Sequence, residues 1–205
     1  MYLKIKRYFD LIFSVFSLVI LSPMLIVLVL VIKIESPGPI LFKQKRVAIN
    51  KTYFNIFKFR TMRIDTPKDT PTHLLENPEI YITKIGKFLR KSSLDEIPQI
   101  FNIIAGQMSI IGPRPALWNQ YDLIEERDKY QANSVRPGLT GWAQINGRDE
   151  LPIEIKAKLD GEYVKKIGLL MDLKCFFGTF ISVVRSEGIM EGSNKNKSEE
   201  IKEHL

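Results

Sequence analysis

An uninterrupted apolar segment near the N-terminus constrains most strongly how this chain can fold. Residues 11–32 carry no formal charge and consist mainly of Leu, Ile, Val and Phe. A helix rises about 1.5 Å per residue, so a run of 22 residues is long enough to cross a hydrocarbon core of about 30 Å. A cleaved secretory signal is disfavoured, because its apolar region is usually shorter and because no small-x-small cleavage site follows this one. The segment predicts a membrane-embedded helix.

Ser22 and Pro23 lie near the middle of this segment and allow two arrangements. Proline removes a backbone donor and clashes with the preceding turn, so it bends or breaks a helix, and the Ser22 hydroxyl can bond a carbonyl that is freed there. A helix that turns back at this point keeps both basic flanks on the cytoplasmic side, whereas a kinked spanning helix sends one of them across. The residues favour the re-entrant helix and leave the span open. The flanking cations are Lys4, Lys6 and Arg7 before the segment, and Lys33, Lys43, Lys45 and Arg46 after it.

The remaining sequence predicts a mostly α fold with little β. The expected organisation is a membrane helix at 1–35, a catalytic domain on the membrane surface at 36–190 and a disordered tail at 191–205. Apolar residues at helical spacing predict the helices, and runs of strand-favouring residues predict the extended segments. These are extended segments at 40–42 and 53–59, a loop at 66–78, and helices at 85–91, 97–104, 117–130, 151–167 and 169–184.

Composition limits the class of partner. Lys and Arg total 30 against 23 acids, giving a formal charge of +7, which suits phosphate substrates, acidic lipid head groups or nucleic acid. We do not expect nucleic acid as a partner, because Trp118 and Trp142 are not interleaved with basic runs as a stacking platform would be. The single cysteine, Cys175, excludes an internal disulfide and is expected to be a small buried apolar residue.

Two adjacent carboxylates, Asp95 and Glu96, precede an apolar helix and have two interpretations. The first is structural: Ser93 with Glu96 fits a capping box, and acids suit the first turn of a helix. However, Pro98 disfavours helical geometry at Ile97, which would leave the acids on a turn before the helix and more exposed.

The second interpretation is chemical. One carboxylate attacks a phosphorus, which splits a difficult transfer into two easier steps, while its neighbour helps to hold a metal. Mg²⁺ prefers carboxylate and phosphate oxygens and stabilises a diphosphate leaving group. The acids alone favour the structural interpretation and do not exclude the chemical one.

Basic residues suited to phosphate binding recur beside Gly and Pro turns. Each one alone is more often a solvated surface cation, but arginine fits phosphate oxygens in a bidentate fork and a rigid turn would hold it with little freedom to lose. No P-loop, zinc spacing or Rossmann glycine pattern is present. The candidates are Lys58 and Arg60, which share a face if extended, Arg90 shortly before Asp95, Arg114 in Gly-Pro-Arg-Pro, Arg136 in Arg-Pro-Gly and Arg148 in Asn-Gly-Arg.

Six sequence motifs, in the order in which they occur, make the chain resemble one family: the monotopic bacterial sugar transferases, or polyprenyl-phosphate phosphoglycosyl transferases. The resemblance covers about residues 6–188, and a small departure is Ile97, where leucine is commoner in the family. The motifs are Ser22-Pro23, Ser-Pro-Gly-Pro at 36–39, Lys-Phe-Arg-Thr-Met at 58–62, Ser-Leu-Asp-Glu-Ile-Pro-Gln at 93–99, Gly-Pro-Arg-Pro at 112–115 and Arg-Pro-Gly-Leu-Thr-Gly at 136–141.

The resemblance implies a role for each candidate residue. It implies a re-entrant helix broken at Ser22-Pro23 and a mostly helical domain resting on the cytoplasmic face of the bacterial inner membrane. Asp95 would be the nucleophile and Glu96 its partner at Mg²⁺. The phosphates would be held by Lys58, Arg90 and Arg114, and the nucleotide would lie near Pro113 and the Arg136 turn.

The implied reaction moves a sugar-1-phosphate from a UDP-sugar to undecaprenyl phosphate with release of UMP, by a ping-pong mechanism through a phospho-sugar aspartyl intermediate. This is the first membrane step of capsule, O-antigen or glycoprotein glycan assembly, and its product would pass to downstream glycosyltransferases. Residues 112–120 are similar to capsule-initiating members that use N-acetylated UDP-sugars, and the family can form homodimers. The alternative, a membrane-tethered scaffold, explains the apolar segment but not the turn-fixed arginines around Asp95 and Glu96.

Overall fold

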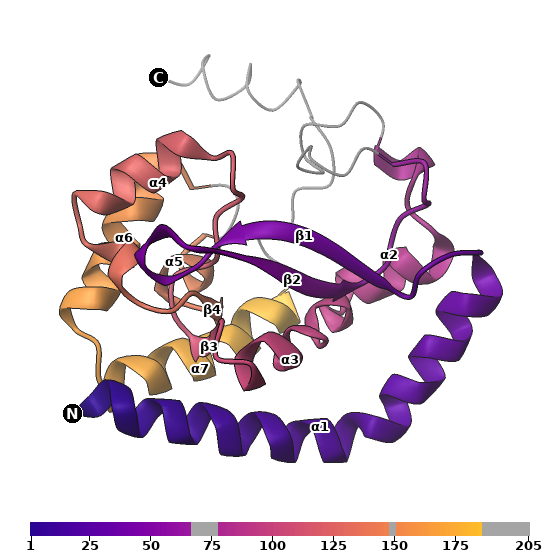
Figure 1. The fold of residues 1–205 in the computed structure, drawn as a ribbon, viewed down its shortest axis with the longest axis horizontal. Helices are drawn as coiled ribbons and strands as arrows, with labels where there is room; N and C mark the ends of the chain where they lie inside the picture. The colour runs from indigo at the N-terminus through magenta and orange to yellow at the C-terminus, as the bar shows by residue number, and fades with distance from the viewer. Residues whose placement is uncertain (67–77, 148–150, 186–205) are drawn as a thin grey trace.

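The computed structural model describes residues 1–66, 78–147 and 151–185, and these residues form a mostly helical protein with two small sheets (Figure 1). The mostly α prediction is thereby confirmed. The predicted loop at 66–78 and the tail at 191–205 lie largely or wholly outside the described residues, and the three-part domain division stays a prediction. The helices are α1 Tyr2–Glu35, α2 Lys84–Lys91, α3 Gln99–Ile104, α4 Tyr121–Asp128, α5 Trp142–Ile145, α6 Ile153–Lys165 and α7 Leu169–Arg185.

Helix α1 contains the apolar segment and continues through Pro23. Figure 1 shows that it runs along one side of the domain and then bends toward the strands. The proline cannot donate to the carbonyl of Val19, and the Ser22 hydroxyl donates to that carbonyl instead at 2.7 Å, as predicted. By length and composition α1 can cross a membrane, and only 11% of its apolar window is buried. The helix is bent rather than interrupted, and its re-entrant placement in a membrane stays a prediction.

The N-terminal third of α1 is attached to the domain by buried polar contacts. Lys6 Nζ donates to Asp172 Oδ2 of α7 at 2.7 Å, and Ser109 donates its hydroxyl to Asp10 at 2.6 Å. All four side chains are buried, so each charge is compensated by a partner of opposite charge or by hydrogen bonds. This network joins residues that lie 166 positions apart in the chain.

The C-terminal third of α1 is attached by apolar packing. Leu28 and Ile32 form a buried cluster with Phe59 and Leu89. Because Phe59 ends one strand and Leu89 lies in α2, this cluster fixes the exit of α1 relative to the elements that carry the candidate cations.

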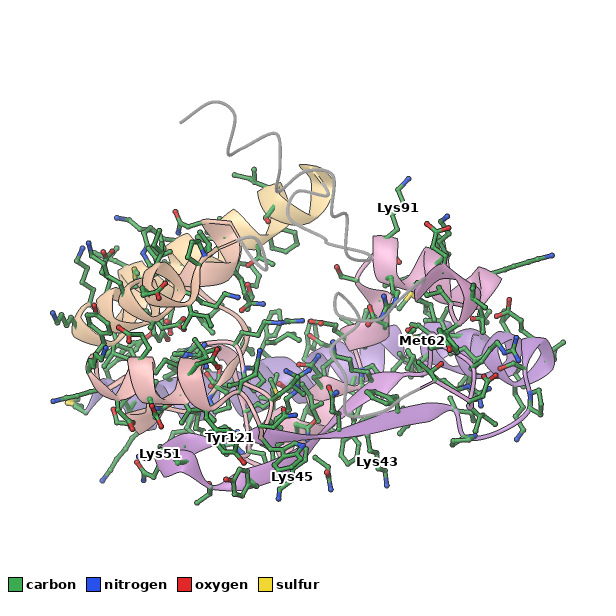
Figure 2. All side chains as sticks on the ribbon, turned by 90° about the horizontal axis from the view of Figure 1, so that it is seen from above. Lys43, Lys45, Lys51, Met62, Lys91 and Tyr121 are labelled. Carbon is green, nitrogen blue, oxygen red and sulfur yellow. The ribbon has the colours of Figure 1, made fainter. Side chains whose placement is uncertain are left out.

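Strands β1 (Leu41–Val47) and β2 (Tyr53–Phe59) form an antiparallel hairpin, in which Lys43 pairs with Phe57 across the strands. The first strand extends beyond the predicted segment at 40–42, and the second has the predicted bounds. Lys43 Nζ lies over the Phe57 ring and Lys45 Nζ lies over the Tyr53 ring, at 5.5 and 4.3 Å from the ring centroids. Figure 2 shows both lysines at the outer edge of the hairpin.

The second sheet was not predicted. Strands β3 (Ser109–Ile111) and β4 (Gly138–Thr140) are each three residues long and pair in parallel. Four short 3₁₀ helices complete the described elements: η1 Ile49–Lys51, η3 Pro78–Ile80, η4 Leu94–Glu96 and η5 Ala132–Ser134. The predicted helices at 85–91 and 169–184 correspond closely to α2 and α7, whereas α3, α4 and α6 are shorter than the predicted helices at 97–104, 117–130 and 151–167.

Candidate active site

Asp95 and Glu96 lie on η4, the turn between α2 and α3. Ser93, the residue before η4, has a left-handed backbone with φ 56°, and its side chain makes no capping hydrogen bond, so the capping interpretation gains no support. The acids lie on a turn before the helix, as predicted, but the expected exposure was wrong, because Asp95 is buried and the Glu96 side chain is 18% exposed. The expected reason was wrong, because Ile97 adopts helical angles (φ −54°, ψ −37°) despite the following proline.

Glu96 is held by two cations. Lys58 Nζ donates to its Oε1 at 2.7 Å, and Arg114 donates from Nη2 to Oε1 at 2.8 Å and from Nη1 to Oε2 at 3.3 Å. Burial raises the pKa of Glu96, but the charges and hydrogen bonds of Arg114 and Lys58 outweigh burial and hold this pKa well below its usual range. Glu96 is therefore ionised at neutral pH.

Asp95 is buried, with 9% of its surface exposed, and makes no hydrogen bond or ion pair within the described residues. Burial raises the pKa of its carboxyl, the charge of Lys58 opposes this rise, and the charge of Glu96 adds to it. The two carboxylates thus differ in environment. Glu96 is fixed by cations, whereas the Asp95 oxygens are available to a reactant or a metal.

Arg90 reaches the same region from α2. Its Nε donates to the Thr61 hydroxyl at 3.1 Å, and its charge lowers the pKa of Asp95. The start of α2 is fixed against the same threonine, because Thr83 donates its backbone N–H to the Thr61 carbonyl at 3.0 Å and caps the helix by accepting from Gly86 N. Thr61, which the sequence did not single out, therefore orients Arg90.

Arg114 lies in one of two glycine-containing turns that are hydrogen-bonded to each other. Gly112 N donates to Thr140 O at 2.8 Å, and Gly138 N donates to Pro113 O at 2.9 Å. A Cβ on Gly138 would lie 2.1 Å from Gly112 N, so only glycine allows the two backbones to approach this closely. Pro113 contributes its carbonyl to the hydrogen bonds between the two turns. It does not line the large cavity described next.

A cavity of about 1310 Å³ contains the carboxylate pair. Cations from three further elements line it beside Asp95 and Glu96, which is the arrangement that phosphate binding requires. The described residues contain no group of three His, Cys, Asp or Glu side chains able to hold a metal. The two carboxylates nevertheless fit Mg²⁺, which commonly binds one or two carboxylates together with substrate phosphates. Four predicted cations line the cavity, namely Lys58, Arg60, Arg90 and Arg114, and so do Lys43, Arg46, Arg63, Arg127 and Lys156.

Arg60 lines this cavity but is bonded to the exit of α1. Its guanidinium donates to the Ser36 carbonyl and hydroxyl, both at 2.7 Å, and to the Pro37 carbonyl at 2.8 Å. Cations suit the C-terminal carbonyls of a helix. Arg60 therefore ties α1 to the end of β2, whereas Lys58 of the same motif contacts Glu96.

Arg136 is not brought to the carboxylates. Arg136 donates from Nε to Gly106 O at 2.9 Å, beyond the end of α3, and does not line the cavity. Arg148 lies outside the described residues. Three predicted cations, Lys58, Arg90 and Arg114, thus meet at the carboxylate pair.

Asn102 is a further positioning residue that was not predicted. It is fully buried on α3, accepts from Phe57 N at 2.9 Å and donates to Asn55 O at 2.8 Å. These bonds fix β2, and with it Lys58, against the helix that follows the two acids. A lone asparagine in the apolar run 100–104 was the available signal, because a buried amide must find partners.

Comparison with known proteins places the chain in a family. The sequence profile described as bacterial sugar transferase matches residues 1–186. The chain is 38% identical over 187 residues to the uncharacterized sugar transferase EpsL of Bacillus subtilis, and the match covers 91% of both chains.

Two further relatives have names that state a reaction. The chain is 40% identical over 186 residues to the undecaprenyl-phosphate glucose phosphotransferase of Komagataeibacter xylinus, covering 85% of this chain and 35% of the relative. It is 33% identical over 195 residues to the UDP-N-acetylgalactosamine-undecaprenyl-phosphate N-acetylgalactosaminephosphotransferase of Aeromonas hydrophila, covering 91% of this chain and 45% of the relative. The chain therefore spans less than half the length of these two enzymes. The profile and the near-complete match to EpsL show that the chain belongs to the bacterial sugar transferase family.

Proposed function

We propose that this protein transfers a sugar-1-phosphate from a UDP-sugar to undecaprenyl phosphate and releases UMP. The observation that carries the proposal is the buried, unengaged carboxylate of Asp95 beside Glu96, which Lys58 and Arg114 hold ionised. The named reactions of the relatives from Komagataeibacter xylinus and Aeromonas hydrophila support the same chemistry.

In the proposed first step an Asp95 oxygen attacks the phosphorus that carries the sugar. The bond from this phosphorus to the bridging diphosphate oxygen breaks, and UMP leaves with the electron pair. Asp95 is then joined to the sugar phosphate as an acyl phosphate. In the second step an oxygen of undecaprenyl phosphate attacks the same phosphorus and frees the carboxylate, so the kinetics are ping-pong.

The cations in the cavity supply electrostatic stabilisation. Lys58, Arg90 and Arg114 lie where negative charge grows on the phosphoryl oxygens and on the departing UMP, and a largely buried site strengthens their effect. Mg²⁺, held by Asp95 and Glu96 together with diphosphate oxygens, would neutralise charge on the leaving group. A scaffold protein would need none of these groups, so they disfavour that alternative.

The finer parts of the proposal concern the sugar and the pathway. We propose an N-acetylated sugar, for which the Aeromonas hydrophila relative is a precedent, whereas the Komagataeibacter xylinus relative uses glucose. The reaction would take place on the cytoplasmic face of the bacterial inner membrane and begin a capsule, O-antigen or glycoprotein glycan. Its product would pass to downstream glycosyltransferases. Homodimer formation stays a prediction of the family resemblance.

Release of UMP tests this function. Purified protein with Mg²⁺, undecaprenyl phosphate and a panel of UDP-sugars is expected to release UMP from at least one N-acetylated sugar nucleotide, and excess chelator is expected to stop the reaction. Full turnover in chelator would rule out the metal. Absence of UMP release from every UDP-sugar in the panel would refute the proposed substrate class.

Labelling of introduced cysteines tests the re-entrant placement of α1. Leu3→Cys and Ser198→Cys are expected to react with an impermeant reagent from the same side of the membrane, and native Cys175 is fully buried and gives little background. Pro23→Ala should shift molecules toward a spanning helix, because it restores the missing backbone donor. Ile26→Ala, at an exposed apolar position on the same helix, is the control and should change nothing. Labelling of the two termini from opposite sides would show that α1 spans the membrane.

A further inference from the structure

The N-terminal third of α1 buries polar side chains and exposes apolar ones. Lys6, Asp10 and Ser14 are buried, and their spacing of four residues places them on one side of the helix. Phe9 and Ile12, from the same two turns, are exposed. A helix that lies in lipid gains little from packing apolar side chains against its own domain, so polar contacts have to hold it there. One of these polar residues, Asp10, reaches beyond the attachment of the helix.

Asp10 bonds strand β3, which lies beside this part of α1 (Figure 1). Its Oδ2 accepts the Ser109 hydroxyl at 2.6 Å, and its Oδ1 accepts the backbone N–H of Ile110 at 3.3 Å. Ser109 and Ile111 are the residues of β3 that pair with β4, and Ile110 lies between them. Because neighbouring N–H groups of a strand point to opposite edges, the Ile110 N–H points away from β4. Asp10 thus takes the place of a neighbouring strand at that edge.

The Asp10 carboxylate is itself held in position. Lys6, one turn earlier, has its Nζ 3.7 Å from Asp10 Oδ1 and 2.7 Å from Asp172 Oδ2 of α7. Arg7 donates to the last two carbonyls of α3, at 2.6 and 2.9 Å, and so attaches the same turn of α1 to a third element. Since α1 is fixed here against both α7 and α3, the carboxylate gives β3 a fixed partner.

The backbone that leads from β3 to Arg114 is bonded along its length. After β3, Gly112 and Pro113 are each hydrogen-bonded to a residue of β4, at 2.8 and 2.9 Å. Arg114 is the next residue and donates to Glu96. Every residue between Ile110 and Arg114 therefore belongs to β3 or to a bonded turn. A displacement of β3 is passed to the guanidinium rather than absorbed by a loop.

We propose that Asp10 is a positioning residue for the reaction, which holds β3 and through β3 sets Arg114 against Glu96. The inference rests on the proposed function and gives the membrane helix a part in assembling the site. Asp10 does not line the cavity, so it acts on the reaction through other residues. A displacement of about 1 Å in a group that stabilises the transition state can cost up to about 100-fold in rate. The alternative role for Asp10 is attachment of α1 alone.

The first test compares three variants of the buried network. Asp10→Ala removes both acceptors, whereas the amide in Asp10→Asn can accept from Ile110 N and donate to the Ser109 hydroxyl oxygen. Tyr2→Phe is the control, because Tyr2 donates to Asp172 at 2.6 Å, at the end of the network that is bonded to α7 rather than to β3. The rate of the first step is measured as UMP release from a UDP-sugar without lipid acceptor. It should fall about 30-fold in Asp10→Ala and stay within about twofold in the other two.

A double-mutant cycle with Arg114→Ala tells positioning from attachment. Asp10→Ala should lower the first-step rate about 30-fold in the otherwise wild-type protein, but at most about twofold in protein that already carries Arg114→Ala. Equal effects in the two backgrounds overturn the proposal, as does a loss in Tyr2→Phe as large as that in Asp10→Ala. Ser109→Ala removes one of the two bonds to β3 and leaves α1 unchanged. It should cost about fivefold with the same dependence on Arg114, and it replaces Asp10→Ala if that variant does not fold.

Hydrogen exchange separates this inference from the reaction itself. The Gly112 and Gly138 amides donate the bonds between the two turns. In Asp10→Ala they should exchange about tenfold faster than in wild type, and in Tyr2→Phe at the wild-type rate, as measured by mass spectrometry with single-residue fragmentation. Unchanged exchange in Asp10→Ala refutes the positioning role, whether or not the protein turns over. Faster exchange in a protein that releases no UMP supports Asp10 as the group that fixes β3 and refutes only the proposed reaction.

Discussion

Asp95→Asn is expected to abolish turnover, by about 10⁴-fold or more, while the protein still folds. The amide keeps the shape of the side chain but cannot attack phosphorus. Burial raises the pKa of Asp95, so at neutral pH the ionised group is less favourable in the folded protein than in the unfolded chain. The neutral amide removes that cost, and we expect the variant to unfold at the same temperature as wild type or at a higher one.

Intact-mass measurement with UDP-sugar and no lipid acceptor identifies the nucleophile directly. Wild type should gain the mass of one sugar phosphate, and Asp95→Asn should gain none. Asp128→Asn is the matched control, because Asp128 lies in an exposed ion pair with Lys51 outside the cavity and should form the adduct normally. An adduct that survives in Asp95→Asn would mean that another residue is the nucleophile.

Much of the fold could be predicted because its longer elements carry periodic signals. The helical spacing at 151–167 and 169–184 and the β-rich run at 53–59 gave α6, α7 and β2 with small errors in their ends. Strands β3 and β4 could not be found, because three residues are too few for a repeating pattern. They pair across the 26 residues that separate Ile111 from Gly138. The glycine-containing motifs at 112–115 and 136–141 were each predicted to form a rigid turn. Their packing against one another was not predicted.

The parts of the candidate site that depend only on local sequence could be predicted. Asp95 and Glu96 are adjacent, so any fold keeps them together, and Arg114 lies in a turn that fixes it. Strand periodicity placed Arg60 with Lys58, but β2 ends at Phe59, and Arg60 instead donates to the Ser36 and Pro37 carbonyls just after α1. A single sequence cannot show that contact, because the preference of those carbonyls for a cation depends on where the chain brings them.

The polar attachment of α1 could not be predicted from the sequence either, because it too depends on which distant residues the fold brings together. Lys6 was predicted to be part of a basic flank that faces the cytoplasm, and Asp172, an acid within the predicted helix at 169–184, was given no role. In the structure each compensates the charge of the other in a buried network. A charge within an apolar stretch was the available signal, since such a charge is rarely buried without a partner.

Glu96→Gln should be severely impaired for a different reason from Asp95→Asn. Removing the charge of Glu96 leaves Lys58 and Arg114 facing one another in a mostly buried site, with side chains 17% and 34% exposed. We expect a loss of about 2 kcal/mol in the free energy of unfolding, less than for a fully buried pair because Arg114 is partly solvated. Turnover should fall by about 10²- to 10³-fold, since the cations and any bound Mg²⁺ lose the group that orients them.

Comparison of two glutamate variants separates this role from simple charge loss. Glu126→Gln is the matched control, because Glu126 is also an ion-paired glutamate with its side chain 18% exposed, and it lies outside the cavity. It should keep full turnover and lose less than about 1 kcal/mol. If the acids only stabilised the start of a helix, Glu96→Gln would cost about 1 kcal/mol and leave turnover largely intact. A slow but detectable phospho-sugar adduct in Glu96→Gln, with none in Asp95→Asn, would assign attack to Asp95 and electrostatic support to Glu96.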